Sequence, residues 1–512
     1  MVGRGSPRGA LGYIEPMTDR PVSEPDVSAE HPLSASWVWA GAHRPPVPRA
    51  LVEAMREGWS PEGPTAGVHP AAGACARRRQ RLGELLAGTT LVVPTGPLKV
   101  RANDTDYRFR PGTDFSYLTG CDEPDAVLVL APGAGRAHAT LFVPERRDQR
   151  SHEFFTDSRY GELWVGPRRG TREAAAHYAI ATAPLEELAK HLAGLEGTAI
   201  ALVRGLDPSV DALVAPSKVD ARLVATLSEM RLVKDAFERE QLEAAIAATV
   251  SGFADVVRAL PEALRHGERV VEGVFNLRAR VAGHDVGYDT IAAAGAHASI
   301  LHWTRNDGAV RPGDLLLLDA GVEGDHLYTA DVTRTLPVSG TFSPAQRRIY
   351  EIVLAAQEAG IAAIRPGVPF AAAHDAATAV LVDGLVDLGL LSNADEALRR
   401  DAQLYRRYTL HGTSHMLGLD VHDCANARQD LYRGDLAEGY VLTVEPGLYF
   451  QANDLTVPEE YRGIGVRIED DIWVGPDGAV NLSAALPRAA NDVEAWMRAQ
   501  WDQGPTPLRL GE

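Results

Sequence analysis

The sequence predicts an α/β protein, in the broad sense that includes α+β folds, with two folded units. Short apolar runs bounded by Gly, Pro or Asp are typical of strands, and 90–94 and 126–130 are of this kind. Helix-forming stretches such as 184–195 and 234–260 alternate with these runs. Of the 512 residues, 45% are hydrophobic and 23% are charged, which is typical of globular proteins with sizeable cores.

Residues 1–75 form a distinct N-terminal extension, because they hold 11 of the 33 prolines and show no sustained helical or strand periodicity. We expect a mobile tail or a strap that lies over the surface. Trp37 and Trp39 lie close together within this extension, so its docking on the folded units is left open.

The first folded unit is expected over residues 76–225. It begins with a helix-like, Arg-rich stretch over 77–87, which an apolar run follows. The runs 114–120 and 126–130 then indicate further short strands. Together with the helical stretches between them, these runs predict an α/β unit.

The second folded unit is expected over residues 226–490, and a C-terminal tail over 491–512. Its first helix, over 234–260, has strong helix formers and favourably placed charges. Another helix is predicted over 343–364, because Ser343 is a good N-cap and a proline occupies the first helical position. The strand-like runs between and after these helices contain the candidate functional residues.

Charge and cysteine content exclude several classes of function. With 51 Lys and Arg against 69 Asp and Glu, the net charge of −18 argues against nucleic acids or anionic membranes as partners and favours small molecules or peptides. The three cysteines form no CxxC pair, so neither a disulfide scaffold nor a thiolate metal site is indicated. This cysteine content suits a reducing cytoplasm, where we expect the protein to be. We find no signal-peptide pattern and no apolar run of about 18 residues, and expect no membrane span.

Two carboxylates occur in neighbouring strand-like runs. Asp319 ends a buried run and shares a strand face with Leu315 and Leu317, so its ionised form would be unfavourable unless a cation neutralised it. Asp331 lies in the next run, and a hairpin of this length can bring both carboxylates side by side. They would repel each other unless a metal bridged them or they shared a proton. Taken alone, this segment favours a simpler explanation, in which Asp319 caps a turn at the end of a strand.

Three of the sixteen histidines lie within twelve residues, at positions 411, 415 and 422. This segment lacks the glutamate of the HExxH motif, which excludes a zincin site. Hydrogen bonding in a polar core would explain any one of these histidines, but it explains all three together poorly.

Two more segments contribute acidic residues. Glu445 ends an apolar strand pattern before Pro446, where it could be a simple strand-end carboxylate. In the following segment Arg467, Glu469 and Asp471 alternate with apolar residues, and a solvated strand face is the default explanation for that alternation. It does not explain the other carboxylates.

Four carboxylates and one imidazole, without sulfur, suit a dinuclear site for hard or borderline divalent ions. Two metals would make water nucleophilic at neutral pH and stabilise a tetrahedral intermediate. The candidate ligands are Asp319, Asp331, His415, Glu445 and Glu469.

The segments 411–423, 442–449 and 463–470 resemble the pita-bread metallopeptidases, and most closely the aminopeptidase P (Xaa-Pro aminopeptidase) family. The segment 107–130 resembles the creatinase-type N-terminal domain of that family. The resemblance covers about residues 76–490, and it implies a creatinase-like α/β domain followed by a C-terminal pita-bread catalytic domain.

The resemblance also implies a role for each ligand. Asp319 would chelate one ion, His415 and Glu445 would hold the other, and Asp331 and Glu469 would bridge both. Glu445 would in addition accept the proton of the attacking water, which becomes a metal-bridging hydroxide.

Five more residues correspond to positions around the substrate. The resemblance implies that His302 and His422 contact the scissile peptide and stabilise its oxyanion, and that His411, Tyr449 and Arg467 surround a proline pocket. Proline in the second substrate position has no peptide N–H, so it must be selected by its ring shape and tertiary amide.

Three features depart from the family pattern. The interval from Asp319 to Asp331 is one residue longer than usual, and we expect the turn near Gly324 to absorb the additional residue. His297 stands where Asn or a small residue is commoner. Residues 1–75 lie outside the part of the chain that the family pattern covers.

The leading hypothesis is a manganese-dependent aminopeptidase that releases the residue before proline, with two Mn²⁺ and with Co²⁺, Zn²⁺ or Fe²⁺ as alternatives. A prolidase, which cleaves only Xaa-Pro dipeptides, is the runner-up. Methionine aminopeptidases usually lack such an N-terminal domain. Non-catalytic pita-bread binding modules and metal-free creatinases are disfavoured, because all five ligands are present. The resemblance further suggests a homodimer or homotetramer.

Overall fold

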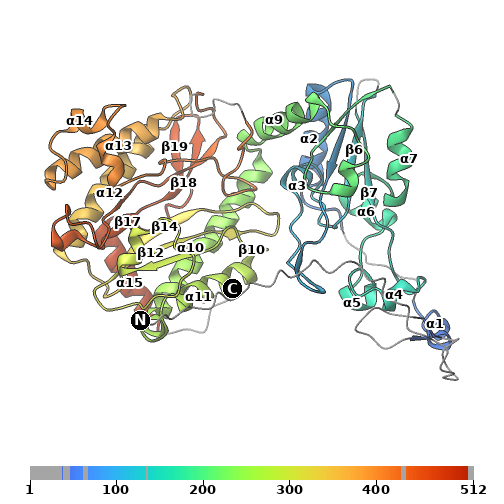
Figure 1. The fold of residues 1–512 in the computed structure, drawn as a ribbon, viewed down its shortest axis with the longest axis horizontal. Coiled ribbons are helices and arrows are strands. Elements are labelled where there is room, and N and C mark those ends of the chain that lie inside the picture. The colour runs from blue at the N-terminus through green and yellow to red at the C-terminus, as the bar shows by residue number, and fades with distance from the viewer. Residues whose placement is uncertain are drawn as a thin grey trace, which may run out of the picture. The chain divides into compact units, whose positions relative to one another are not determined.

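The computed structural model describes residues 37–38, 47–60, 67–133, 137–195, 197–427 and 434–504 (Figure 1). The chain forms two compact units. One comprises Met1–Pro64 with Arg146–Arg169, and the other comprises Thr65–Glu145 with Gly170–Glu512. Most of both predicted domains therefore belongs to a single compact unit.

The smaller unit contains only short elements. They are β1 (Trp37–Val38), β2 (Val47–Pro48), α1 (Arg49–Ala54), α4 (Glu153–Thr156) and α5 (Glu162–Val165). Val52 of the N-terminal extension forms an apolar cluster with Phe154 and Phe155. Because this burial orders part of the extension, a wholly mobile tail is the wrong description for its described residues. The docking of Trp37 and Trp39 lies outside the described side chains.

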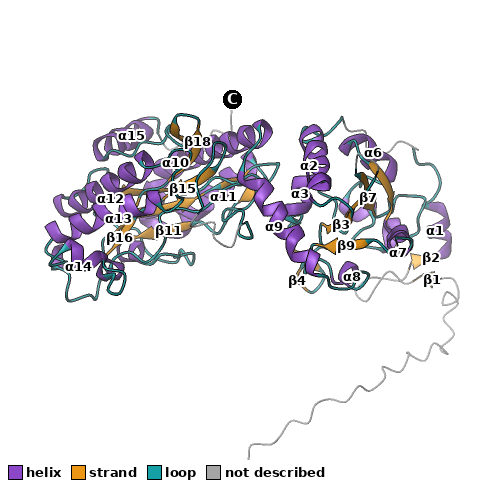
Figure 2. Ribbon diagram, turned by 90° about the horizontal axis from the view of Figure 1, so that it is seen from above, coloured by secondary structure: helices purple, strands orange, loops and turns teal. Residues whose placement is uncertain are grey.

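The N-terminal half of the larger unit is built on a five-stranded sheet with the order β8-β7-β6-β3-β9. β3 pairs antiparallel with β6 and parallel with β9. Leu91 and Val93 belong to one apolar cluster and Val92 to another, so helices cover both faces of the sheet (Figure 2). The strands are β3 (Thr89–Pro94), β4 (Val100–Ala102), β5 (Thr105–Asp106), β6 (Val127–Ala131), β7 (His138–Val143), β8 (Ala181–Pro184) and β9 (Ala199–Leu202). The helices are α2 (Ala72–Leu85), α3 (Thr113–Thr119), α6 (Thr171–Tyr178), α7 (Leu188–Ala193), α8 (Pro208–Asp211) and α9 (Lys218–Leu232).

The strand predicted over 114–120 is wrong, because these residues form helix α3. Phe115, Leu118 and Thr119 are buried on one side of that helix, at the i, i+3, i+4 spacing of a helix face. Gly120 ends the helix with a φ of 66° and donates its N–H to Ser116.

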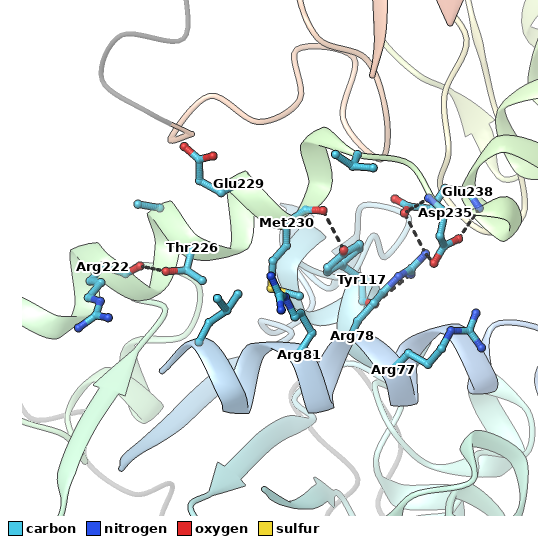
Figure 3. Close-up of a pocket in the computed structure, with 13 residues that line it drawn as sticks. Arg77, Arg78, Arg81, Tyr117, Arg222, Thr226, Glu229, Met230, Asp235 and Glu238 are labelled. Carbon is cyan, nitrogen blue, oxygen red and sulfur yellow. Dashed lines mark hydrogen bonds and ion pairs between the residues drawn. The ribbon is translucent and has the colours of Figure 1, made fainter. Parts of the chain in front are cut away.

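The predicted boundaries at 75/76 and 225/226 fall inside helices, since α2 begins at Ala72 and α9 extends to Leu232. These helices lie where the two halves of the larger unit meet. Figure 3 shows Arg78 of α2 directed toward Asp235 and Glu238, with N–O distances of 2.9 and 3.3 Å. Linear patterning could not locate these boundaries, because regular helices continue through them.

The C-terminal half combines long helices with short antiparallel sheets. Its helices are α10 (Ala236–His266), α11 (Glu268–Ala282), α12 (Pro344–Ala362), α13 (Ala372–Asp387), α14 (Ala394–Leu398) and α15 (Ala490–Asp502). Its strands are β10 (Asp285–Val286), β11 (Ile291–Ala294), β12 (Leu315–Ala320), β13 (Val322–Glu323), β14 (Val332–Pro337), β15 (Val441–Val444), β16 (Gly447–Tyr449), β17 (Gly465–Arg467), β18 (Asp470–Gly475) and β19 (Gly478–Asn481). The main core joins α10, α11, α12 and α15 to the sheet β11-β12-β14.

Helices α10 and α12 confirm two sequence predictions. Ser343 caps α12 in a capping box with Gln346, and Asp235 caps α10 in the same manner with Glu238. Among the described helices, α10 is the one long and apolar enough to cross a membrane, which the sequence reading did not anticipate. Half of its apolar window is buried inside the fold, where Phe253 joins the main core.

The predicted C-terminal tail is wrong for residues 491–502, which belong to α15. Val493 and Met497 lie one turn apart and are buried in the main core. The next residue on this face, Trp501, donates its indole N–H to the carbonyl of Val257 at 2.8 Å. The apolar face of this last helix holds it against α10.

Candidate active site

A cavity of about 880 Å³ gathers the acidic and histidine residues singled out from the sequence. They come from segments far apart in the chain. The predicted residues that line the cavity are His302, Asp319, Asp331, His411, His415, His422, Glu445, Arg467 and Glu469. Tyr449 lies beside it, with its hydroxyl oxygen 2.8 Å from Nε2 of His411.

Asp319 and Asp331 are brought together by the antiparallel pairing of β12 and β14. Asp319 lies opposite Thr333 in this pair, and Asp331 immediately precedes β14. The hydroxyl oxygen of Tyr288 lies 2.6 Å from Asp319 and 2.5 Å from Asp331. Because a hydroxyl has one proton, Tyr288 donates to one carboxylate at a time.

His415 presents Nε2 to two carboxylates. This nitrogen lies 3.2 Å from Oδ2 of Asp331 and 3.5 Å from Oε1 of Glu445. Its other nitrogen, Nδ1, lies 3.1 Å from the carbonyl of Met416. Donation from Nδ1–H to this carbonyl leaves Nε2 to bind a metal, which is the usual arrangement of a histidine ligand.

The donor set fits a divalent cation. Asp331, His415 and Glu469 each offer one ligand atom, and these atoms lie within 4.8 Å of one another. Burial, followed by the charges of Asp331 and Glu445, raises the pKa of Glu469 well above its ordinary value. Burial also raises the pKa of Asp319, against the opposing charge of Arg467. A divalent ion would relieve both the desolvation and the mutual repulsion of these carboxylates.

Glu445 directly follows β15 and lies in the cavity beside His415. Burial raises its pKa to about 7, although the charge of His415 opposes this shift. Burial lowers the pKa of His415, but the hydrogen bond to Asp331 and the charge of Glu445 outweigh burial and raise that pKa to about 9. A carboxylate with a pKa near neutrality suits proton transfer.

The default explanation of residues 467–471 as a solvated strand face is excluded, in agreement with the site roles predicted for Arg467 and Glu469. Arg467 is 4% exposed, Glu469 is 1% exposed and Asp471 is fully buried. Alternation of polar and apolar residues shows only that a strand has two different faces. Here the polar face is directed into the protein, where Thr333 donates its hydroxyl to Glu469 at 2.6 Å.

A second group of polar residues adjoins the carboxylates. Arg467 donates to the hydroxyl of Tyr449 at 3.0 Å, and Tyr449 contacts His411. Burial and the charge of Arg467 lower the pKa of His411 to about 4, so this imidazole is neutral at physiological pH. Burial raises the pKa of Tyr449 to about 12, so its phenol keeps its proton.

His302 and His422 present exposed side chains at the cavity. The ring of His422 lies edge-on to that of His415, with centroids 4.4 Å apart. Burial, followed by the charge of His415, lowers the pKa of His422. A neutral imidazole donates one N–H and can also accept a proton.

Two residues of the site were not found from the sequence. Tyr288 is a lone tyrosine between α11 and β11, so no local pattern marked it. Asp471 accepts the N–H of Asp331 at 3.1 Å, and it thereby orients a candidate ligand. Asp471 belongs to the segment in which polar and apolar residues alternate, but the explanation of that alternation as a solvated strand face gave Asp471 no role.

The fold and the donor set together define a two-domain metallopeptidase. Residues 240–476 match the model of metallopeptidase family M24, and residues 75–201 match that of the aminopeptidase P N-terminal domain. The chain belongs to metallopeptidase family M24, with the N-terminal domain of aminopeptidase P. This result confirms the resemblance and the two-domain fold class predicted from the sequence motifs.

Individual relatives support the same family membership. The chain is 52% identical to Xaa-Pro aminopeptidase 1 of Streptomyces coelicolor over 461 residues, which cover 89% of this chain and 93% of that protein. It is 49% identical to Xaa-Pro aminopeptidase 2 of the same organism, with 88% and 97% covered. Among solved structures, an aminopeptidase of Pseudomonas aeruginosa is similar with a TM-score of 0.76 and 33% identity, covering 85% of this chain and all of that one. The zinc-substituted aminopeptidase P of Escherichia coli in complex with product has a TM-score of 0.76, 33% identity and coverage of 84% and 99%.

Proposed function

We propose that this chain is a metal-dependent aminopeptidase that releases the N-terminal residue from peptides with proline in the second position. One observation carries the proposal: the donor group of Asp331, His415 and Glu469, whose two carboxylates are buried, lies in the same cavity as Asp319 and Glu445. The relatives named Xaa-Pro aminopeptidase support the substrate class.

The proposed cofactor is a pair of divalent ions, with Mn²⁺ as the first candidate. Asp319 would hold one ion, His415 and Glu445 the other, and Asp331 and Glu469 both. Such ions polarise the scissile carbonyl and acidify water when they are bound. A donor set of carboxylate oxygens and one imidazole nitrogen accepts Mn²⁺, Co²⁺, Fe²⁺ or Zn²⁺. Activity of the metal-stripped protein with each ion in turn distinguishes them.

The protein side chains supply proton transfer and orientation. Glu445, which lies in the cavity beside His415, accepts the proton of the attacking water and passes it to the leaving proline nitrogen. His302 and His422 line the same cavity and donate to the carbonyl oxygen as negative charge develops on it. His411, Tyr449 and Arg467 bound the space for the proline ring.

Prolidase activity is the competing assignment, since an Xaa-Pro dipeptide would present its Xaa–Pro bond to the same metal ligands and histidines. We further propose that the protein works in the cytoplasm as a homodimer or homotetramer. Size-exclusion chromatography with light scattering measures the oligomeric state directly, and a monomer would contradict that part of the proposal.

The decisive experiment uses metal-stripped protein with and without Mn²⁺ on three substrates: an Xaa-Pro-Yaa tripeptide, an Xaa-Pro dipeptide and an Xaa-Ala-Yaa control. We expect Mn²⁺-dependent release of Xaa from the tripeptide and little from the control. Cleavage of the dipeptide alone would change the assignment to prolidase. No metal-dependent cleavage of any peptide would refute the peptidase function.

A further inference from the structure

Glu268 is a fully buried carboxylate that fastens both ends of one chain segment, residues 294–308. Its Oε1 accepts the N–H of Ala294 at 2.8 Å, and its Oε2 accepts the N–H of Gly308 at 2.7 Å. The N–H of Glu268 in turn donates to the carbonyl of Gly308 at 3.0 Å. A Cβ atom at Gly308 would lie 2.4 Å from Cε1 of His297 and 2.8 Å from Oε2 of Glu268, so this close approach favours glycine there.

Two side chains of the same segment use the remaining acceptor positions of Glu268. His297 contacts Oε1 through Nδ1 at 2.8 Å, and Trp303 donates its indole N–H to Oε2 at 2.8 Å. The two rings stack on each other, with centroids 3.8 Å apart and an interplanar angle of 26°. Glu268 therefore holds the ends and the middle of the segment in one arrangement.

The segment fastened in this way supplies His302 to the active-site cavity. His302 directly precedes Trp303, and its neighbours Leu301 and Thr304 line the cavity as well. The side chain of His302 is exposed, so packing around the ring itself does little to fix it. Its position depends on the backbone of the segment. Glu268 accepts four hydrogen bonds from that segment, in addition to the bonds that involve Asn306 and Gln451.

We propose that Glu268 is a positioning residue for the peptidase reaction, and that it acts by fixing His302 against the scissile peptide. The inference rests on the proposed function, in which His302 donates to the carbonyl oxygen. Displacing a catalytic group by about 1 Å can lower the rate about 10²-fold. Loosening a segment that is otherwise tied by four hydrogen bonds permits a displacement of this order.

Glu268→Gln is the sharpest substitution, because it keeps the size and shape of the side chain. The amide oxygen can still accept two hydrogen bonds, whereas the amide nitrogen cannot accept the other two. We expect kcat for an Xaa-Pro-Yaa tripeptide to fall about 10²-fold. We expect KM and the bound-metal content to change little, because the ligands belong to other segments. Amide hydrogen exchange should become faster within 294–308 and remain unchanged in α12.

The double variant separates positioning from a general structural effect. If Glu268 acts through His302, Glu268→Gln should cause no further loss of kcat in a His302→Ala background. An equal loss in both backgrounds would overturn the proposal, and so would full activity of folded Glu268→Gln. A His302→Ala variant with wild-type activity would also overturn it, while leaving the peptidase function intact. A wild-type protein that cleaves none of the peptides would refute both.

Two more variants keep the test conclusive. Trp303→Phe removes one hydrogen bond to Glu268 but keeps the ring stack, so it should lower kcat less than Glu268→Gln does. This loss of kcat should likewise be absent in the His302→Ala background. If Trp303→Phe and His302→Ala lower kcat additively, the proposal is overturned, even if Glu268→Gln fails to fold. Glu494→Gln is the matched control, because Glu494 is another buried carboxylate, which accepts the N–H of Phe342 at 3.0 Å. It should retain wild-type kcat.

Discussion

The guanidinium of Arg467 donates a hydrogen bond of 2.5 Å to Asp319, and both side chains are buried. The same guanidinium donates to Tyr449 at 3.0 Å. Arg467 thus joins the candidate metal ligands to the residues proposed to surround proline. It also supplies the cation that the sequence required for a buried Asp319, before any metal is considered.

Arg467→Met should destabilise the metal-free protein by about 3–5 kcal/mol, because it leaves Asp319 as an uncompensated buried charge. Mn²⁺ should then raise the melting temperature of this variant more than that of the wild type, since the ion replaces the missing cation. Thermal unfolding with and without Mn²⁺ measures both effects. Arg407→Met is the control, because Arg407 forms an exposed ion pair with Asp454 worth at most about 1 kcal/mol. An equal Mn²⁺ effect in Arg467→Met and wild type would contradict the prediction.

Glu445→Gln should reduce kcat by about 10²–10⁴-fold, since an amide cannot accept the proton of the attacking water. The circular dichroism spectrum should remain that of the wild type. Steady-state kinetics on an Xaa-Pro-Yaa tripeptide provide the measurement. Glu438→Gln is the matched control, because Glu438 precedes the same strand but is exposed. Retained activity in Glu445→Gln would remove Glu445 from its proposed role.

Tyr288→Phe should weaken Mn²⁺ binding by about 10–100-fold, the usual effect of losing a group that orients metal ligands. Its hydroxyl lies between Asp319 and Asp331, and the phenyl ring leaves both without that donor. Calorimetric titration of the metal-free protein with Mn²⁺ measures the change. Tyr328→Phe should have little effect, because the buried hydroxyl of Tyr328 makes no hydrogen bond within the part of the chain that the structure describes. Unchanged affinity in Tyr288→Phe would show that the hydroxyl does not orient the ligands.

Asp423→Asn should destabilise the fold in a pH-dependent manner. Burial opposes ionisation of Asp423, but the charges of Arg231 and Lys234 outweigh it and lower the pKa below its ordinary value of 3.8. A carboxyl with a lowered folded-state pKa stabilises the fold above pH 3.8, and this contribution disappears as the pH falls through the folded-state value.

The difference in free energy of unfolding between wild type and Asp423→Asn should therefore be constant near neutral pH, at about 3 kcal/mol or more. It should shrink below pH 3.8, where the wild-type carboxyl also becomes neutral. Urea unfolding at a series of pH values measures this difference. A gap that persists in acid would indicate that the carboxylate charge is not the cause.

The chemistry of the site could be predicted from the sequence, because the relevant patterns are local. Asp319, Glu445 and Glu469 each stand at the end of a strand pattern or within one, and three of the four candidate histidines lie in one short segment. A carboxylate on an apolar strand face requires a cation whatever the fold. Arg467 supplies one beside Asp319, so the metal site followed from four carboxylates and one imidazole taken together and not from Asp319 alone. The helix over 343–364 was predictable for the same reason, since its capping residues are neighbours in sequence.

The tertiary structure decided what depends on contacts between distant segments. It turned the polar face of 467–471 inward, placed Tyr288 between two carboxylates and ordered the last helix against α10. It also made Glu268 the anchor of a segment that begins twenty-six residues later. Periodicity shows that a strand or helix has two faces, but only packing against the rest of the chain determines which face is buried and which polar groups meet there.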